Sequence, residues 1–332
     1  MAKKATPVWE AFGQNGLERI EMTFSRKSML LDLVKSYRIF RKLKPHAVGT
    51  HSNIDSKVAL IAATAAGIKH RLRYRHVSIP IRSNVMNRWL YNSCATSIIT
   101  TAKDISQRIV EGLNVPKGKT HVIPTGVDAP LEMESKDEAR LRLCRELGVS
   151  LKTRFLGQIS VLRRWKGQVD VMDAFDRIGY QFPDHHLVFV GGGPGLDYLP
   201  PEAEKRKYSQ RIHFLGHKEN PWPYFLALDL NVLASWEAEG IPQSGIQSML
   251  AKTPFIGTRV GGIPEIVNHE SNGILVEPRN PKDLSRAMLH LLSDKKYQQY
   301  LVANAYKYAT KIASTAIMGE KVLRILKGSV SK

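Results

Sequence analysis

Short apolar runs alternate along this chain with longer stretches in which apolar residues recur every three or four positions. Short runs indicate buried strands, and the wider spacing indicates amphipathic helices. Strands that alternate with helices are typical of βα units and of a parallel sheet. The pattern therefore predicts an α/β fold.

The predicted elements have the same order in both halves of the chain. In the first half we expect strands at 46–52, 71–78, the start of 96–113 and 121–128, and helices at 57–67 and in the rest of 96–113. In the second half we expect strands at 155–162, 186–195, 212–217, 227–235, 254–259 and 273–278, and helices at 167–178, 242–252 and 282–294.

The chain length predicts two domains. The chain has 332 residues, and a domain typically has about 150. The segment 134–150 is polar and helical in pattern. We therefore place the boundary near residue 150, with a first domain at 1–150 and a second from 151 onward.

Composition excludes several classes of protein. Hydrophobic residues make up 43% and charged residues 24%, which are globular values that argue against disorder, collagen or a coiled coil. The apolar stretch 58–68 is shorter than the about 20 residues that span a bilayer. The first residues contain lysines without an apolar core behind them, so no secretory signal is predicted. Two isolated cysteines, Cys94 and Cys144, indicate a reducing compartment.

Positive charge is concentrated in the first part of the chain. The formal net charge is +19, and residues 1–128 hold 21 basic and 8 acidic side chains, whereas the remainder holds 28 and 22. Such a field attracts a polyanion: nucleic acid, an anionic membrane or a phosphorylated substrate.

The segment 25–45 has seven basic residues and one acid. Seven apolar side chains can share one helical face: Met29, Leu30, Leu33, Val34, Tyr37, Phe40 and Leu43. Two interpretations are open. The helix either docks on anionic lipid or packs on the sheet with a solvated basic rim.

The stretch 235–267, SWEAEGIPQSGIQSMLAKTPFIGTRVGGIPEIV, has the richest chemistry. A helix that begins near Pro242 presents unpaired N–H groups and the positive end of its dipole, which suits a phosphate. Glu239 precedes it, where a carboxylate can accept hydrogen bonds from sugar hydroxyls. Gly261 and Gly262 follow a strand and allow a close approach of the backbone.

This stretch resembles the glycosyltransferase family 4 group, retaining group 1 enzymes with the GT-B fold. The family pattern E-G-(F/I)-(G/P)-x4-E, then A-M-A and G-G-x-P-E, is similar to residues 239–250 and 261–265. Further similar segments follow in the family's order: VIPTGVD (122–128), WKG (165–167), VGGGPG (190–195), FLGH (214–217), ALDLNVLAS (227–235) and NGILVEPRNPKDL (272–284). The resemblance covers roughly residues 40–330 and implies two Rossmann-like domains that face a central cleft. It places the donor domain at 151–311 and a C-terminal helix at 312–332 that crosses back to the first domain.

The resemblance implies roles for matched residues. Glu239 would contact the donor sugar, Lys166 would neutralise the donor diphosphate, and His76 would lie near the reaction centre. Arg163, or else Arg164, stands in for an arginine that pairs with the lysine. Other implied donor contacts are Gly191, Gly192, Gly216, His217, Gly240, Pro242, Gln243, Ser244 and Gln247. His76 as a purely structural histidine, and the glycines at 191–193 as a plain turn, are alternatives. No metal site and no cofactor are expected.

The chain departs from the family pattern at two points. Gln247 replaces the second glutamate, which contacts the donor ribose, and an amide lacks its charge. The family's first strand and glycine-rich loop are not found at the start, so LERIEMTF (17–24) would be its second strand. We expect a shortened first domain or a chain without its natural start.

The resemblance implies a retaining glycosyltransferase that moves a sugar from a nucleotide-diphosphate sugar, such as a UDP- or GDP-sugar. The expected acceptor is an anionic, phosphorylated or lipid-linked glycan of bacterial lipopolysaccharide or capsule synthesis. The expected location is cytoplasmic, with peripheral contact to the inner face of the membrane. One alternative is a catalytically impaired nucleotide-sugar-binding homologue or partner subunit. A nucleic-acid-binding protein is the other, although no aromatic–basic recognition motif supports it.

Overall fold

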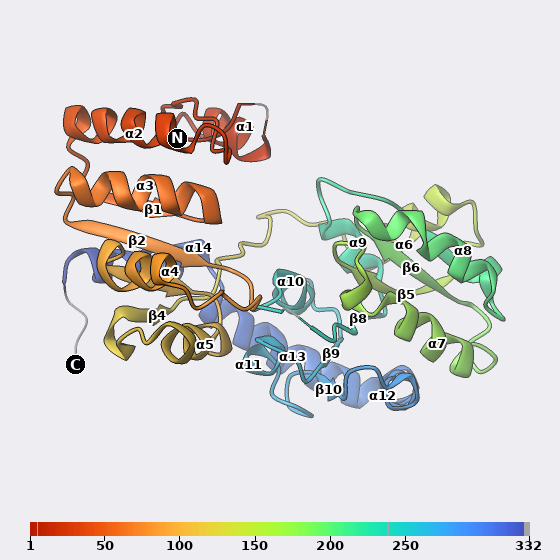
Figure 1. Cartoon of the computed structure of the whole chain (residues 1–332). Helices are drawn as coiled ribbons and strands as arrows, with labels where there is room; N and C mark the ends of the chain where they lie inside the picture. Colours follow the sequence, from red (N-terminus) through yellow and green to blue (C-terminus); the bar gives the residue numbers. More distant parts are fainter. Residues whose placement is uncertain (5, 238, 329–332) are drawn as a thin grey trace. The chain divides into compact units, whose positions relative to one another are not determined.

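The chain forms two compact units, each with its own parallel sheet (Figure 1). The computed structural model describes residues 1–4, 6–237 and 239–328. Residues 1–123 and 321–332 form the first unit, and residues 124–320 form the second. The predicted α/β class with two Rossmann-like domains is therefore confirmed.

The first unit contains a four-stranded sheet in the order β1-β2-β3-β4, and all its neighbouring pairs are parallel. Its strands are β1 (Ala47–Thr50), β2 (His70–Arg75), β3 (Ser97–Thr100) and β4 (Thr120–Val122). Its helices are α1 (Pro7–Gln14), α2 (Met29–Leu43), α3 (Asn53–Ala65), α4 (Val85–Trp89) and α5 (Lys103–Leu113), with short turns η1 (Leu90–Cys94) and η2 (Lys117–Lys119).

Helix α2 packs on α3, and α3 packs on the sheet (Figure 1). Phe40 of α2 lies in one core cluster with Val48 of β1 and Ala59 of α3. On the same side of α2, Asp32 and Ser36 are buried. The Asp32 carboxylate accepts hydrogen bonds from the backbone N–H groups of residues 23 and 24. The inward face of α2 is therefore partly polar.

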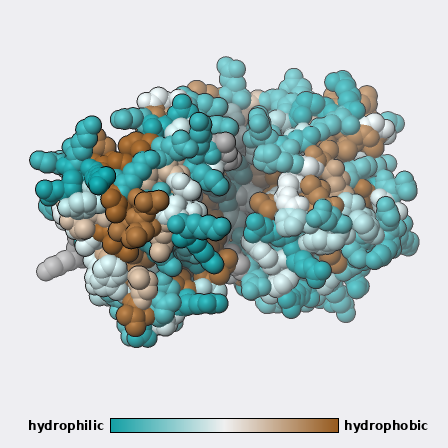
Figure 2. Space-filling model, turned by 45° about the horizontal axis from the view of Figure 1, so that its top comes forward, coloured by the Kyte–Doolittle hydropathy of each residue, from teal (hydrophilic) through white to brown (hydrophobic). Residues whose placement is uncertain are grey.

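The outward side of α2 exposes several apolar side chains among basic ones. Leu30 and Leu31 are about three-quarters exposed, at 74% and 75%, and five further apolar side chains of this helix and its end are at least partly exposed: Met29, Leu33, Val34, Tyr37 and Leu43. Figure 2, in which the top of Figure 1 comes forward, shows hydrophobic side chains gathered on this unit among hydrophilic ones. The expected single apolar face is split, because Phe40 is buried and Leu33 half-buried, whereas Met29, Leu30, Val34, Tyr37 and Leu43 are exposed.

The predicted strand at 17–24 is wrong. Within the described part of the chain this segment belongs to no named strand, and it makes an isolated bridge between Ala2 and Glu21. Of its apolar side chains Met22 is buried, whereas Leu17 is exposed. The segment pairs with the first residues of the chain instead of joining the sheet.

The second unit contains a six-stranded sheet in the order β10-β9-β8-β5-β6-β7, with parallel neighbours throughout. The strands are β5 (Arg154–Ile159), β6 (His185–Val190), β7 (Ile212–Phe214), β8 (Leu230–Leu233), β9 (Phe255–Thr258) and β10 (Ile274–Val276). The order runs outward from β5 in one direction and from β8 in the other, which is a doubly wound sheet.

Helices cover both faces of this sheet. One core contains side chains of α6 (Lys136–Leu147), α9 (Trp222–Ala227), α10 (Gln243–Leu250) and α13 (Lys295–Ile312). The other contains side chains of α7 (Gln168–Ile178), α8 (Leu199–Glu204) and α12 (Pro281–Ser293). The remaining elements are α11 (Ile263–Ile266) and the turns η3 (Arg164–Lys166), η4 (Pro194–Asp197) and η5 (Ser209–Arg211).

The division between the units lies after residue 123 rather than near residue 150. Helix α6, read from sequence as a boundary, buries Ala139, Leu143 and Cys144 in a core of the second unit. The predicted C-terminal helix at 312–332 corresponds to α14 (Thr315–Leu326). Residues from 321 onward group with the first unit, and 329–332 lie outside the described residues.

All ten predicted strands other than 17–24, and the predicted helices, correspond to elements of the structure with ends that differ by a few residues. Among the described residues, no helix combines the length and apolar character needed to cross a membrane.

Substitution of Phe155 by Ala should strongly destabilise the second unit. This side chain of β5 is 0% exposed, and a large-to-small change at such a core position costs about 3–5 kcal/mol. The matched control is Leu151→Ala, at a side chain that is 52% exposed, where we expect a change within about 0.5 kcal/mol. Urea unfolding followed by tryptophan fluorescence measures both, and equal losses would contradict this assignment of the core.

Candidate functional site

The strand order of the second unit reverses between β5 and β8, which are direct neighbours. The helices that follow these two strands, α7 and α10, pack on opposite faces of the sheet. The loops after the two strands therefore diverge at the carboxyl edge. Open α/β sheets bind ligands at this position.

Lys166 and Glu239 form an ion pair at this edge. Lys166 is the last residue of the turn η3, which follows β5, and Glu239 lies in the loop after β8. The Lys166 Nζ and Glu239 Oε1 atoms are 2.5 Å apart, and the two side chains are 12% and 6% exposed. The sequence marked both residues, and the structure brings them into contact. The pair therefore places one positive and one negative charge, both largely buried, at the carboxyl ends of the strands.

Polar neighbours hold the pair in place. The Ser235 hydroxyl donates a hydrogen bond of 2.5 Å to Glu239 Oε1. The Thr258 hydroxyl donates to the Ser235 carbonyl. On the other side, the buried Gln158 amide donates to the Lys166 carbonyl at 2.8 Å. Both charged residues are therefore tied to the strands themselves.

The glycine turn after β9 packs directly on the loop that contains Glu239. Gly261 has a φ of +54°, and a Cβ there would lie 2.1 Å from the Glu239 carbonyl oxygen. A Cβ on Gly262 would lie 2.7 Å from the Gly240 carbonyl. The Gly262 N–H donates to the Glu239 carbonyl at 3.3 Å. Only glycines allow this approach, so the turn fixes the Glu239 backbone.

A second glycine turn joins the loops after β5, β6 and β7. A Cβ on Gly191, which has a φ of +147°, would lie 1.9 Å from the Ser160 carbonyl oxygen. The Gly191 N–H donates to the Gly216 carbonyl at 2.8 Å. A Cβ on Gly192 would lie 3.3 Å from the His217 Cβ. The four residues predicted here, Gly191, Gly192, Gly216 and His217, thus form one cluster.

Helix α10 begins at Gln243 after Pro242, and no side chain among the described residues caps it. Its first backbone N–H groups have no partner within the helix. Gln243 is exposed, whereas Ser244 and Gln247 are half-buried. Gly240 and Pro242 are buried beside them. The N-terminus of α10 therefore offers donors and a positive dipole end next to Glu239.

The predicted arginine partner of Lys166 has no such fixed position. Arg163 is exposed, just before η3. Arg164, also exposed, places its guanidinium 5.5 Å from the centre of the Tyr198 ring. Among the described residues, neither guanidinium makes an ion pair with Glu239, and the role of Arg163 stays a prediction.

His76 belongs to the first unit and has its own surroundings. Its Nε2 lies 3.0 Å from Nδ1 of His51, and the rings of both stack in a row with Tyr74. His76 is exposed, yet partial desolvation, followed by the charges of His51, Arg73 and Arg75, lowers its pKa to about 4. His76 is therefore neutral at pH 7, able to exchange hydrogen bonds but without a charge.

Sequence analysis missed the supporting residues Ser235 and Gln158, and it missed His51. Ser235 opens the motif that we quoted, so its position directly after a strand was a usable signal. Gln158 is a polar residue inside an apolar strand, and its amide contacts the backbone carbonyl of Lys166. No motif marks His51, which pairs with a residue 25 positions away.

Family models match both parts of the chain. Residues 142–308 match the model described as glycosyl transferases group 1, and residues 15–130 match the model described as glycosyltransferase family 4. An uncharacterized glycosyltransferase of Methanocaldococcus jannaschii is 28% identical over 221 residues, which are 65% of this chain and 55% of that protein. A D-inositol 3-phosphate glycosyltransferase of Corynebacterium jeikeium is 24% identical over 72% of this chain and 59% of that protein.

A solved structure shares the fold. The Anabaena protein HepE in complex with UDP superposes with a TM-score of 0.83 at 19% identity, covering 96% of this chain and 88% of that one. At this identity the likeness shows the fold, which is GT-B. The chain matches little more than half the length of the first curated relatives.

Substitution of Gly261 by Ala should both destabilise the second unit and displace the loop of Glu239. The new Cβ would meet a carbonyl oxygen, which adds about 1–3 kcal/mol of overpacking to the backbone strain at positive φ. Gly148→Ala is the control, because Gly148 has a φ of +66° and no atom within 4 Å, and it should cost only about 1–2 kcal/mol. Urea midpoints compare the two, and an equal cost would rule out the contact.

Proposed function

The chain belongs to the glycosyl transferases group 1 family, and we propose that it is a retaining glycosyltransferase. It takes a sugar from a nucleotide-diphosphate sugar and transfers it to a phosphorylated or lipid-linked glycan acceptor. The observation that carries this proposal is the buried Lys166–Glu239 pair beside the uncapped N-terminus of α10.

The donor's leaving group sets the main chemical demand. When the bond from the anomeric carbon to the diphosphate oxygen breaks, negative charge builds up on the diphosphate. Lys166 and the N–H groups at the start of α10 supply a fixed positive field for that charge. Glu239 accepts hydrogen bonds from hydroxyls of the donor sugar. The proposed mechanism needs no metal.

The ion pair makes donor binding an exchange reaction. Glu239 Oε1 is held by both Lys166 and Ser235. An arriving diphosphate competes with the carboxylate for the ammonium group, and the sugar hydroxyls then occupy the carboxylate. The ammonium group then pairs with the diphosphate and the carboxylate accepts hydrogen bonds from the sugar, so neither buried charge is left without a polar partner.

The names of two similar proteins support the proposed substrate classes. The Anabaena protein was solved with UDP and with UDP-glucose, which supports a nucleotide sugar as the donor. The Corynebacterium relative is named for a phosphorylated acceptor, inositol 3-phosphate. Gln247, half-buried in α10, is our proposed contact to the donor ribose in place of a glutamate.

We also propose that the first unit touches an anionic membrane through α2. Leu30, Val34 and Tyr37 are exposed and lie three or four positions apart, on one face of the helix. Seven basic residues fall within 25–45, and each cation near an anionic surface adds about 1 kcal/mol. A peripheral location at the inner face of the membrane suits a lipid-linked acceptor of cell-surface polysaccharide synthesis.

Glu239→Gln should reduce transfer about 100-fold or more, the usual effect of removing a group that acts in the transition state. Lys166→Met should weaken binding of a nucleoside diphosphate about 10- to 100-fold, because a charge-assisted hydrogen bond is lost. Titration calorimetry with UDP, GDP, ADP and CDP measures binding, and release of nucleoside diphosphate from sugar conjugates measures transfer.

The matched controls are Lys205→Met and Glu202→Gln, which break a surface ion pair of the same residue types. These control variants should change neither the binding of nucleoside diphosphate nor the rate of sugar transfer. The double variant K166M/E239Q removes both buried charges and separates loss of function from loss of stability. Normal transfer by Glu239→Gln would overturn the site assignment, and donor binding without transfer to any acceptor would favour a nucleotide-sugar-binding protein.

The variant L30S/V34S should bind anionic vesicles at least about 10-fold more weakly, because buried apolar side chains contribute about 1.5–3 kcal/mol each. Sedimentation with vesicles of phosphatidylglycerol and phosphatidylcholine measures this, with pure phosphatidylcholine as the uncharged reference. Leu131→Ser, at an exposed leucine of the second unit, is the control. Equal binding by all three proteins would remove α2 from the proposal.

A further inference from the structure

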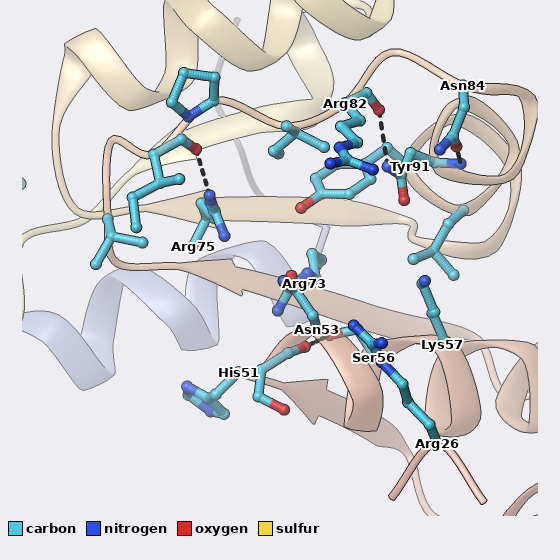
Figure 3. Close-up of a pocket in the computed structure, with 17 residues that line it drawn as sticks. Arg26, His51, Asn53, Ser56, Lys57, Arg73, Arg75, Arg82, Asn84 and Tyr91 are labelled. Carbon is cyan, nitrogen blue, oxygen red and sulfur yellow. Dashed lines mark hydrogen bonds between the residues drawn. The ribbon is translucent and has the colours of Figure 1, made fainter. Parts of the chain in front are cut away.

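The first unit contains a pocket that the proposed donor chemistry does not use. Its volume is about 660 Å³, and it lies beside the ends of β1 and β2 and the start of α3. In the view of Figure 3, His51, Asn53, Ser56, Lys57 and Arg26 lie along one side, and Arg82, Asn84 and Tyr91 lie along the other. Arg73 and Arg75 lie between the two sides.

The pocket is lined by five cationic side chains. They are Arg26, Lys57, Arg73, Arg75 and Arg82. Among the described residues that line it there is no aspartate or glutamate. The Asp55 carboxylate, on the first turn of α3, accepts hydrogen bonds from the backbone N–H groups of His51 and Ser52. That carboxylate therefore caps the helix.

Arg73 is the most deeply buried of these cationic side chains. It is 1% exposed, and arginine is almost never fully buried without a charged partner. Its guanidinium donates to the carbonyl oxygens of Tyr74, at 2.8 Å, and Thr50, and to Oδ1 of Asn53, both at 3.4 Å. These acceptors are all neutral, and the Nε atom is buried without a hydrogen-bond partner. Among the described residues, this guanidinium therefore donates only to neutral acceptors and has no carboxylate partner.

Neighbouring groups respond to this charge. Desolvation lowers the pKa of Arg75, which Tyr91 raises and Arg73 lowers again. Desolvation also lowers the pKa of His51, where Asp55 acts in the opposite direction and Arg73 adds to the lowering. The five cationic side chains, with no carboxylate among the lining residues, give the pocket a positive potential.

We propose that this pocket binds a phosphate group, a monoester or diphosphate, with Arg73 at its base and Lys57 and Arg82 at its sides. A guanidinium can donate two parallel hydrogen bonds to phosphate oxygens, and the Nε–H of Arg73 has no acceptor among the described residues. Val77, Ile79 and Ile81 line the pocket as well and suit an apolar part of the same ligand. The assignment of this phosphate to the acceptor rests on the proposed function. The binding of a phosphate in the pocket does not depend on that function.

The phosphate can come from a soluble ester or from a lipid-linked one. Titration calorimetry on the full chain therefore uses glycerol 3-phosphate and decyl phosphate as probes, with glycerol as the uncharged reference. We expect binding of at least one phosphate and none of glycerol. Tighter binding of decyl phosphate assigns the lipid-linked source, and tighter binding of glycerol 3-phosphate the soluble one.

The variant K57Q/R82Q should lower phosphate affinity at least 10-fold and leave UDP affinity unchanged. Both side chains reach solvent, so the fold should tolerate their loss. Arg73→Lys keeps the charge but loses the paired donors, and it should also weaken binding, with the melting temperature measured to check folding. Lys117→Gln, an exposed lysine away from the pocket, is the control.

Lys166→Met separates this proposal from the donor site. This variant should weaken the binding of UDP and leave the binding of the phosphate probe unchanged. Phosphate affinity that survives in K57Q/R82Q, or that is lost only in Lys166→Met, would overturn the pocket assignment. Absence of UDP binding with intact phosphate binding would instead count against the proposed donor chemistry alone.

Discussion

The reversal of strand order between β5 and β8 is the constraint on which the second unit's site depends. Because α7 and α10 leave these neighbouring strands toward opposite faces, the two loops separate at the edge of the sheet. Lys166 and Glu239, 73 positions apart in sequence, come from these loops and meet there. A different strand order with the same local elements would leave each charged group buried without its partner, which is unfavourable by several kcal/mol per ion.

Close backbone packing then converts this topology into a fixed geometry. Gly261 places one turn against the Glu239 carbonyl, and Gly191 places another against the Ser160 carbonyl, at distances that no Cβ allows. Side-chain hydrogen bonds from Ser235 and Gln158 complete the support. The site's polar groups are thus positioned mainly by backbone contacts between neighbouring strand ends, where a loop cannot shift without breaking packing on both sides.

The sequence predicted those features that depend on local pattern. Strands, helices and the Glu239 region are marked by apolar runs and by glycine and proline at fixed spacing. It could not predict features decided by tertiary packing. The alternation of basic and other residues around Arg73 does not indicate that this arginine is buried. The sequence pattern of α2 does not indicate that Asp32 is buried while Leu30 is exposed. Tertiary packing also decides the structure of 17–24, which makes an isolated bridge with Ala2 and does not extend the open edge of the sheet at β1.

The two units treat buried positive charge in opposite ways. Lys166 has a carboxylate 2.5 Å away, so the pair is internally neutral and a diphosphate must replace Glu239 at the ammonium group. In the part of the chain that the structure describes, Arg73 donates hydrogen bonds only to neutral oxygens, so its charge acts on any anion that enters the pocket. Desolvation makes both arrangements strong. The first favours discrimination, because only a ligand that satisfies Lys166 and Glu239 together recovers the broken pair. The second favours capture, because an anion meets no competing carboxylate.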